Sequence, residues 1–390
     1  MNICFMAHFA MIPHNGGIQR VTTLLSREFS RRGHNICFLC YANYAKNDIN
    51  NPAIEFPQFY IDITNEIVKE NLCQFIDKKG INCLISQEQD ANSVRLLAMM
   101  PDTVKIVSVH HTMPFIYHGA SRKSLWREFP SNSLKMVIHK TVALSFTDFF
   151  INYKANKERM IYYQTLKYSE RFVFLSEHFF PRILHYVPDF PKEKLVAINN
   201  PNTFDASISC DYGSKKNVVL WVGRVDPNKN CMDFLKAWRL FFDNHPTWSA
   251  VVAGDGSELD RCMHWAKRHA LRNITFLGYY QAVEKLYNEA KIFVSTSFKE
   301  GWPMTLTEAI SRGCVPCVYN TFDTVAEILE DGVTGLLCNP KPESLAAKLE
   351  ELASNEKRLY EMAMAGKSSI GKFSATHICD QWEDLLNSIY

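Results

Sequence analysis

The chain has 390 residues, of which 47% are hydrophobic and 22% charged, with 43 Lys and Arg against 41 Asp and Glu. This composition excludes a disordered chain, and a net charge of +2 gives no general attraction to nucleic acid. No uninterrupted run of about 18 apolar residues predicts a transmembrane helix. The length favours two domains of ~100–200 residues each.

Apolar runs alternate with amphipathic segments along the first half of the chain. Residues 3–9 predict a first strand rather than a signal peptide, because no positively charged region precedes them. The segment from Gly17 to Gly33 predicts a helix, with Val21, Leu25 and Phe29 on one apolar stripe. Further strands are expected at 35–41, 83–86, 104–109, 171–176 and 195–199, and a long helix at about 133–165.

The second half repeats this alternation, with strands expected at 217–223, 249–254, 273–278, 292–297 and 314–319. Their continuous β-branched runs are typical of strands covered on both faces. Two β-α-β series therefore predict an α/β fold with two doubly wound, parallel-sheet domains. We place the domains at 1–200 and 201–373, with a linker near 199–216, and expect the last helix, 374–390, to pack back on the first domain.

Twelve cysteines are spread along the chain, and two pairs, Cys37/Cys40 and Cys314/Cys317, have C-x-x-C spacing. A zinc or redox site would place such a pair in a loop or at a helix start. Both pairs lie in predicted strands, where one side chain of each pair points away from the other. The cysteines are therefore interpreted as reduced core thiols of a cytoplasmic protein.

Two loops that follow predicted strands carry residues suited to phosphate binding. Gly16 and Gly17 precede the first helix, where glycines let a backbone approach a phosphate or a sugar hydroxyl, although a simple tight turn would also use them. Gly223 opens the loop that holds Arg224 and Lys229, two cations able to grip a diphosphate. The alternative for that loop is a solvated basic turn.

The segment from Phe298 to Ala309 gives the strongest signal. A strand ends, Glu300 and Gly301 form a turn, and a helix begins near Pro303, so backbone N–H groups at the helix start would face a phosphate. These N–H groups belong to Met304, Thr305 and Leu306. Glu300 and Glu308 flank them and could hold hydroxyl groups at the two ends of a nucleotide-sugar.

A histidine pair, His110 and His111, ends the strand predicted at 104–109, at an edge where ligands bind to open α/β sheets. Either histidine could face a substrate, and a structural role remains the alternative. Several motifs are absent: G-x-G-x-x-G, Walker A, G-x-S-x-G, H-E-x-x-H and D-x-D. Without D-x-D, we expect no metal ion to hold a diphosphate through that motif.

These motifs together resemble the family 4 retaining glycosyltransferases (glycosyl transferases group 1), which have the GT-B architecture. That architecture implies two facing Rossmann-like domains with parallel sheets and an inter-domain cleft. The resemblance is carried by Gly16-Gly17-Ile18-Gln19-Arg20, Arg32-Gly33-His34, Val222-Gly223-Arg224, Ala253-Gly254-Asp255-Gly256, Phe276-Leu277-Gly278, Glu300-x7-Glu308 and Gly313-Cys314-Val315-Pro316.

The resemblance implies an enzyme that moves a sugar from a nucleotide-diphosphate sugar, with UDP favoured over GDP and no cofactor or metal. Arg224 and Lys229 would hold the diphosphate, Glu308 the ribose, and Glu300 the transferred sugar. His110, preferred to His111 because it directly ends the strand, would lie beside that sugar. The implied donor contacts also include the backbone at Gly16, Gly17, Gly223, Gly301, Met304, Thr305 and Leu306, with the base near Gly278 and Tyr279. Trp302 stands where the family often has a smaller residue, which would narrow the sugar pocket.

Residues 118–182 carry 11 Lys and Arg against 5 Asp and Glu, together with 13 aromatic residues. We interpret this segment as a surface for a glycan or polyprenyl-diphosphate-linked acceptor, or for the inner face of an anionic membrane. An ordinary packed helix is the alternative. A UDP-sugar 2-epimerase of the same architecture and a non-catalytic sugar-nucleotide-binding subunit are the rival functions, and the oligomeric state is open.

Overall fold

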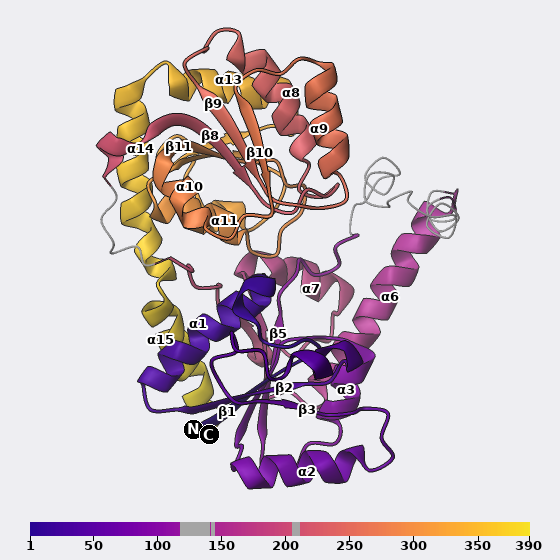
Figure 1. The fold of residues 1–390 in the computed structure, drawn as a ribbon. Coiled ribbons are helices and arrows are strands. Elements are labelled where there is room, and N and C mark those ends of the chain that lie inside the picture. The colour runs from indigo at the N-terminus through magenta and orange to yellow at the C-terminus, as the bar shows by residue number, and fades with distance from the viewer. Residues whose placement is uncertain (118–140, 142–144, 205–210) are drawn as a thin grey trace. The chain divides into compact units, whose positions relative to one another are not determined.

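The computed structural model describes residues 1–117, 141, 145–204 and 211–390, which form two compact units. Unit 1 contains residues 1–117, 151–203 and 375–390, and unit 2 contains the other described residues, chiefly 211–374. Each unit is built around one parallel sheet with helices on its faces (Figure 1).

Unit 1 has a seven-stranded parallel sheet in the order β3-β2-β1-β4-β5-β6-β7. Its central strands are buried because nearly every residue is apolar, as in β1, where five of six residues are buried. The strands are β1 (Asn2–Ala7), β2 (Asn35–Cys40), β3 (Gln58–Tyr60), β4 (Cys83–Ser86), β5 (Lys105–His110), β6 (Arg171–Phe174) and β7 (Leu195–Ala197). The helices are α1 (Gly17–Arg31), α2 (Val68–Lys79), α3 (Ala91–Leu97), α6 (Thr147–Leu166), α7 (Phe180–Tyr186) and α15 (Ala375–Asn387).

Unit 2 has a six-stranded parallel sheet in the order β10-β9-β8-β11-β12-β13. The strands are β8 (Lys216–Val222), β9 (Ser249–Ala253), β10 (Ile274–Gly278), β11 (Ala290–Ser295), β12 (Val315–Tyr319) and β13 (Leu336–Cys338). The helices are α8 (Cys231–Phe242), α9 (Leu259–Arg268), α10 (Val283–Glu289), α11 (Met304–Ser311), α12 (Val325–Ile328), α13 (Pro342–Ala353) and α14 (Glu356–Ser369), followed by the short helix η6 (Ile370–Phe373).

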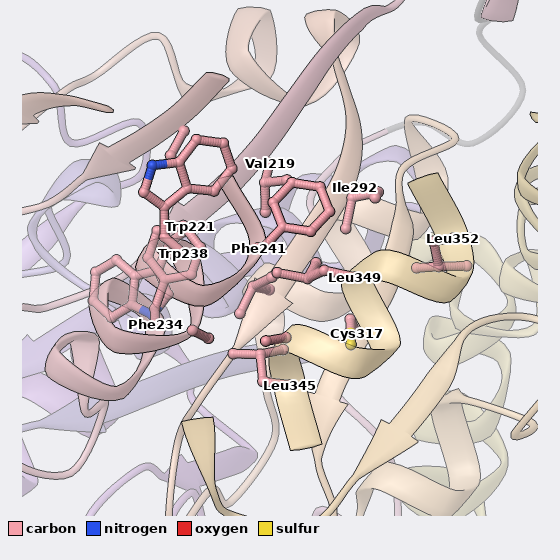
Figure 2. Packing of buried hydrophobic residues seen from close by; sticks show 14 of the residues in the cluster. Val219, Trp221, Phe234, Trp238, Phe241, Ile292, Cys317, Leu345, Leu349 and Leu352 are labelled. Atoms are coloured by element: carbon pink, nitrogen blue, oxygen red, sulfur yellow. The ribbon is translucent and has the colours of Figure 1, made fainter. Parts of the chain in front are cut away.

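The largest core cluster of unit 2 fills one face of its sheet. Trp221 of β8 and Ile292 of β11 lie there with Phe241 of α8 and Leu349 of α13, and the side chains interdigitate (Figure 2). Alternate strand residues such as Leu220 are buried on the opposite face. Because both faces of the sheet are covered, polar side chains gather at the edges where its strands meet the loops.

The structure adds two strands to those expected from the sequence. β3 and β13, each of three residues at a sheet edge, were not predicted, whereas β7, equally short and also at an edge, was expected within 195–199. The long helix predicted from about 133 is described from Thr147 as α6, and most of 133–146 lies outside the described residues.

Helix α15 packs against α1 within unit 1 (Figure 1). Arg32, the residue that follows α1, bonds Glu28 of α1 at 3.0 Å and Glu383 of α15 at 2.7 Å. His34 lies 2.8 Å from the same Glu383 carboxylate. The last described helix is therefore part of the first unit, as its apolar stripe and these polar contacts require.

The C-x-x-C pairs occupy core positions. Cys37 and Cys40 belong to β2 and lie in two different hydrophobic clusters, so they point to opposite faces, as predicted. Cys317 is in β12, whereas Cys314 precedes that strand and is held near the Tyr287 carbonyl at 3.0 Å. The described cysteines are unbridged, and no group of three or more metal-ligating side chains forms among the residues that the structure describes.

Candidate functional site

The loops after β8 and β11 meet at the centre of the second sheet. β8 and β11 are neighbours, and the strand order runs outward from them in opposite directions, to β10 on one side and β13 on the other. In open α/β sheets, ligands bind at the carboxyl ends of strands at this kind of reversal. The residues predicted at 223–230 and 298–308 therefore lie at the place where the fold itself favours a ligand.

Hydrogen bonds fasten the two loops to each other. Phe298 N–H donates to the Asn228 carbonyl at 2.9 Å, and the Asn228 side-chain amide donates to the Lys299 carbonyl at 2.9 Å. The Thr296 hydroxyl lies 2.9 Å from the carbonyl oxygens of both Lys229 and Asn230. These contacts fix the backbone on both sides of the predicted diphosphate site.

Lys229 and Glu300 form the central ion pair of this edge. Lys229 Nζ lies 2.6 Å from Glu300 Oε1, and the two side chains are 19% and 11% exposed. Both residues were predicted for the site, one for a phosphate and one for a sugar, but their pairing was not. A basic and an acidic group held together in this way can address the phosphate and the hydroxyls of one ligand.

Arg224 lies on the solvent side of the same loop. Its guanidinium is 3.1 Å from Asp226, and its side chain is 78% exposed. Asp226 also accepts the Lys229 N–H at 2.9 Å, so this carboxylate orients the turn that presents both cations. Asp226 was not among the predicted site residues, although it stands within the same sequence motif.

Two glycines bring the neighbouring loop against Gly223. Gly254 has φ +150°, and a Cβ there would lie 1.8 Å from the Gly223 carbonyl oxygen. Gly256 has φ +154°, and its Cβ would lie 2.6 Å from the Val225 carbonyl oxygen. Only glycine permits this approach, so the G-D-G motif locks the turn that carries Arg224.

Of the predicted base-binding residues, Gly278 ends β10 and Tyr279 follows it, at the same edge. Gly278 accepts the Gly254 N–H through its carbonyl at 2.7 Å and has φ +64°. Tyr279 beside it is 62% exposed. The structure therefore places Gly278 and Tyr279 two strands from β8, connected to Gly223 through the glycine-rich loop after β9.

The start of α11 differs from its prediction. The Met304 N–H donates to the Trp302 carbonyl at 3.0 Å, and the Leu306 N–H donates to the Pro303 carbonyl at 2.9 Å. These tight turns arise because Pro303, with its fixed φ, stands at the N-cap. Two of the three N–H groups predicted to face a phosphate are therefore engaged locally, which leaves Thr305 as the central predicted donor, beside Gly301 in the preceding turn.

Glu308 occupies the buried side of α11. It is 1% exposed, and its Oε2 accepts a hydrogen bond from the Tyr287 hydroxyl at 3.2 Å. Tyr287 comes from α10 and was missed by the sequence analysis, since no motif marks it. Trp302 packs edge-on against Phe373 of η6, with the ring centroids 5.1 Å apart, and so contributes to the unit 2 core.

Gly16 and Gly17 lie at the corresponding edge of unit 1, after β1 and beside β4, where that strand order reverses. Among the residues that the structure describes, a Cβ at Gly17 would meet no atom within 4 Å, and one at Gly16 would meet only the flexible Gln19 side chain. Packing within the protein therefore does not demand these glycines. The lack of side chains at these two positions agrees with a site where a ligand approaches the backbone.

His110 ends β5 in unit 1 and is held in one orientation. Gln89 donates its amide to the Val109 carbonyl, which turns its Oε1 towards His110 Nδ1 at 3.0 Å. His110 Nδ1 therefore carries the proton, and Nε2 accepts from the Thr112 hydroxyl at 3.0 Å. Burial, together with the neighbouring His111, lowers the pKa of His110 to about 3, so the ring is neutral near pH 7.

The two candidate histidines face different surroundings. His110 lines a pocket in unit 1. His111 bonds Gln87 through Nε2, and burial lowers its pKa to about 4. Gln89, which fixes His110, was missed by the sequence analysis because it follows a different strand, β4.

Comparison with known families and structures identifies the second half of the chain. Residues 211–369 match the family described as "Glycosyl transferases group 1". A curated relative from Campylobacter jejuni, "GalNAc-alpha-(1->4)-GalNAc-alpha-(1->3)-diNAcBac-PP-undecaprenol alpha-1,4-N-acetyl-D-galactosaminyltransferase", is 31% identical over 193 residues. This match covers 49% of the chain and 54% of the relative, so the chain spans about half the length of the curated relatives it matches.

Solved structures resemble the whole chain. Anabaena Alr3699/HepE in complex with UDP and glucose has a TM-score of 0.73 at 15% identity, over 100% of both chains. S. aureus TarM, in complex with Fondaparinux, alpha-GlcNAc-glycerol and UDP, has a TM-score of 0.68 at 14% identity, over 99% of this chain and 100% of that one. At these identities the likeness shows the fold, and the α/β, GT-B prediction of two Rossmann-like parallel-sheet domains is confirmed.

None of the helices in the described part of the chain has the length and apolar character needed to span a membrane. The unit 2 residues predicted for a donor site, from Gly223 to Glu308, all fall inside the matched range. Residues 211–369 therefore match the glycosyl transferases group 1 family, and the chain has a fold of the GT-B class.

Proposed function

We propose that the chain is a retaining glycosyltransferase of family 4. It would move a sugar from a UDP-sugar to a glycan or lipid-linked acceptor in surface polysaccharide or glycoconjugate assembly. The observation that carries this proposal is the Lys229–Glu300 pair at the strand-order reversal of a group 1 domain. UDP in the structures of Anabaena HepE and S. aureus TarM supports the choice of base.

Departure of the diphosphate is the step that needs the most charge stabilisation. Arg224 and Lys229 would stabilise the leaving oxygens without a metal ion, since preorganised cations lower the barrier where charge develops. Glu300 would orient the transferred sugar through its hydroxyls, and Glu308 would hold the ribose. Because no separate carboxylate nucleophile is assigned, we draw front-face attack on an oxocarbenium-like centre.

The remaining predicted residues would position the donor. Gly16, Gly17 and Gly223 would admit phosphate or sugar close to the backbone, and Gly278 and Tyr279 would border the base. His110, neutral and fixed by Gln89, would exchange hydrogen bonds with sugar hydroxyls rather than donate charge. No cofactor other than the nucleotide-sugar substrate enters this proposal.

We also propose a polyprenyl-diphosphate-linked acceptor and peripheral contact with the inner face of an anionic membrane. The name of the Campylobacter jejuni relative includes an undecaprenol-linked diphosphate, which supports the acceptor class. In the predicted contact segment 118–182, α6 exposes Phe149, Tyr153 and Met160 at 73%, 55% and 55%. Their spacing places them along one side of the helix. Much of 118–144 lies outside the described residues.

The test combines donor binding with donor turnover. A panel of UDP- and GDP-sugars should raise the unfolding temperature of the full chain by mass action, with a UDP-sugar giving the largest shift. That donor should then be consumed with acceptor and in the presence of EDTA, and the new linkage should keep the donor's anomeric configuration. Epimerised donor formed without acceptor would instead assign the chain as a 2-epimerase, and binding without turnover on any acceptor would assign a non-catalytic subunit.

A further inference from the structure

Two cysteine thiols meet across the first two strands of the unit 1 sheet. Cys4 of β1 and Cys37 of β2 are paired in the parallel register, so their side chains point to the same face of the sheet. Both belong to the same hydrophobic cluster, and the two thiols hydrogen bond to each other. Adjacent strands lie ~4.7–4.9 Å apart, which falls within the ~4.4–6.8 Å between the Cα atoms of bridged cysteines. The backbone therefore holds this reduced pair at a separation that a disulfide can span.

Cys37 also lines a pocket of about 320 Å3 at the amino ends of β1 and β2. Because the strands are parallel, this pocket lies at the sheet edge opposite to the one that carries Gly16 and His110. Cys37 is 8% exposed, whereas Cys4 is 0% exposed. A small reagent that enters the pocket therefore reaches Cys37 first, with Cys4 directly behind it.

A cation lines the same pocket. Lys79 is the last residue of α2, and its Nζ lies 4.7 Å from the centroid of the Phe59 ring, which packs against the cluster that holds Cys37. The hydrogen bond from Cys4 lowers the pKa of Cys37 against the effect of burial, and the charge of Lys79 lowers it further. Burial is the main cause that raises the pKa of Cys4. Because the thiolate is the nucleophile in cysteine chemistry, Cys37 is the reactive member of the pair.

We propose that Cys37 and Cys4 form a thiol modification site that reacts with a small hydroperoxide and closes to a disulfide. The Cys37 thiolate attacks one oxygen of hydrogen peroxide, the O–O bond breaks, and the other oxygen leaves as hydroxide, which takes the proton that the thiol released. The product is a sulfenic acid at Cys37 and one water. The Cys4 sulfur then attacks the Cys37 sulfur, and the sulfenic hydroxyl leaves with the Cys4 proton as a second water. The two thiols lose two electrons and the peroxide gains them, so the step needs no further reactant.

Peptide mapping by mass spectrometry, after brief exposure of the full chain to hydrogen peroxide, tests the proposal. A disulfide between Cys4 and Cys37 should be the main new linkage, and dithiothreitol should reverse it. In Cys4→Ser the reaction should stop at the sulfenic acid, which dimedone labels at Cys37, because the resolving thiol is missing. Cys262→Ser is the matched control, since it breaks another hydrogen-bonded pair, with Cys231, whose two thiols are both 1% exposed. This control should leave the Cys4–Cys37 linkage unchanged.

A second measurement uses the cysteines unaltered, so it does not depend on the folding of Cys4→Ser. Iodoacetamide should alkylate Cys37 faster than Cys73, although Cys73 of α2 is the more exposed thiol. Lys79→Gln should slow alkylation of Cys37 at pH 7 by about threefold or more and move its pH profile to higher pH, because a nearby positive charge stabilises the thiolate. Lys78→Gln is the control, because Lys78 precedes Lys79 on the same helix without lining the pocket.

Three results would overturn the assignment. Peroxide could oxidise Cys37 no faster than Cys231 and Cys262, or the sulfenic acid at Cys37 could persist in the unaltered chain without a bond to Cys4. Lys79→Gln could also give the same pH profile as Lys78→Gln. None of these measurements uses a nucleotide-sugar or an acceptor, so their outcome is independent of the proposed transferase function.

Discussion

Lys229 is held by an acidic side chain at the point where the proposed donor would bring further negative charge. The 2.6 Å contact with Glu300 keeps the ammonium group in a defined position before any ligand arrives. Arg224 is far more exposed and is paired with Asp226 at 3.1 Å. The two cations therefore differ in freedom of movement, although they serve the same leaving group in the proposed mechanism.

Removal of either cation should lower transfer. We expect Arg224→Ala and Lys229→Ala each to reduce kcat by about a hundredfold or more, the scale of losing one preorganised stabiliser of transition-state charge. Steady-state kinetics with saturating UDP-sugar measures this effect. Lys236→Ala, which removes a half-exposed lysine paired with Asp233 on α8, should leave kcat nearly unchanged. Wild-type turnover in both test variants would contradict the proposed role.

At the scale of single residues, the sequence indicated residues of the loops but not the side chains that contact them. Arg224, Lys229 and Glu300 stand in motifs whose residue types and spacing point to phosphate and sugar binding. The pairing of Lys229 with Glu300 joins positions 71 residues apart, and no local pattern encodes it. Gln89 and Tyr287 were missed for the same reason, because each acts on a site residue from another element.

At the scale of elements, the close approach in the glycine-rich loop after β9 predicts how a substitution there changes the free energy of unfolding. Gly254→Ala should lower the free energy of unfolding by more than the ~1–2 kcal/mol of a left-handed backbone alone, because its Cβ would overlap the Gly223 carbonyl. Gly332→Ala is the matched control, with φ +80° and no atom within 4 Å of the added Cβ. Chemical denaturation compares the two variants, and equal losses would contradict the close-approach explanation.

The contact between α1 and α15 should make the stability of the protein depend on pH. Hydrogen bonds from Arg31 and Arg32 lower the pKa of Glu28. For Glu383, burial alone would raise the pKa, but hydrogen bonds from His34 and Arg32 outweigh the effect of burial and lower it. Stability from these carboxylates is present above their unfolded pKa of about 4.3 and is lost as pH falls through the lower folded value.

We therefore expect Arg32→Gln to lower the free energy of unfolding by about 1–3 kcal/mol at pH 7 and by much less near pH 3. Urea denaturation at both pH values measures the difference. Arg31→Gln removes a 66% exposed arginine that bonds Glu28, and should lower the free energy of unfolding less than Arg32→Gln does, because solvent screens an exposed pair. A loss for Arg32→Gln that does not change with pH would argue against the carboxylate network.

The sequence predicted the central strands of both sheets and missed two short edge strands. The central strands of both sheets were found because each is a continuous apolar segment buried on both faces. β3 and β13 have three residues each and were missed, whereas the equally short β7 was expected within 195–199. The N-terminal turn of α11 was predicted with outward N–H groups, but the local turns around Pro303 engage two of them.

For the whole molecule, two repeated β-α-β series were enough to predict the two-unit α/β fold, because parallel strands need crossover helices in regular alternation. The last helix was expected to pack back on the first domain, but the repetition could not reveal what holds it there. That depends on charged partners more than 340 positions apart, such as Arg32 and Glu383.

The exposed aromatic side of α6 makes a prediction for the intact chain. Full-length protein should co-sediment with phosphatidylglycerol vesicles more than with phosphatidylcholine vesicles, and added salt should weaken this binding. The double change Phe149→Ser/Tyr153→Ser should reduce it several-fold, since each aromatic side chain contributes buried apolar area. Leu240→Ser, which alters an exposed apolar residue on α8, is the control. Sedimentation indifferent to anionic lipid would leave α6 as an ordinary packed helix.

Unit 1 is assembled from separate stretches of chain, and its α15 helix is translated after all of unit 2. A nascent chain leaves the ribosome from its N-terminus, and domains generally fold as units. The continuous stretch 211–374 can thus complete its sheet while α1 still lacks its helical neighbour. The domain whose synthesis begins first is therefore the one that finishes folding last, because Arg32 meets Glu383 only when α15 has been made.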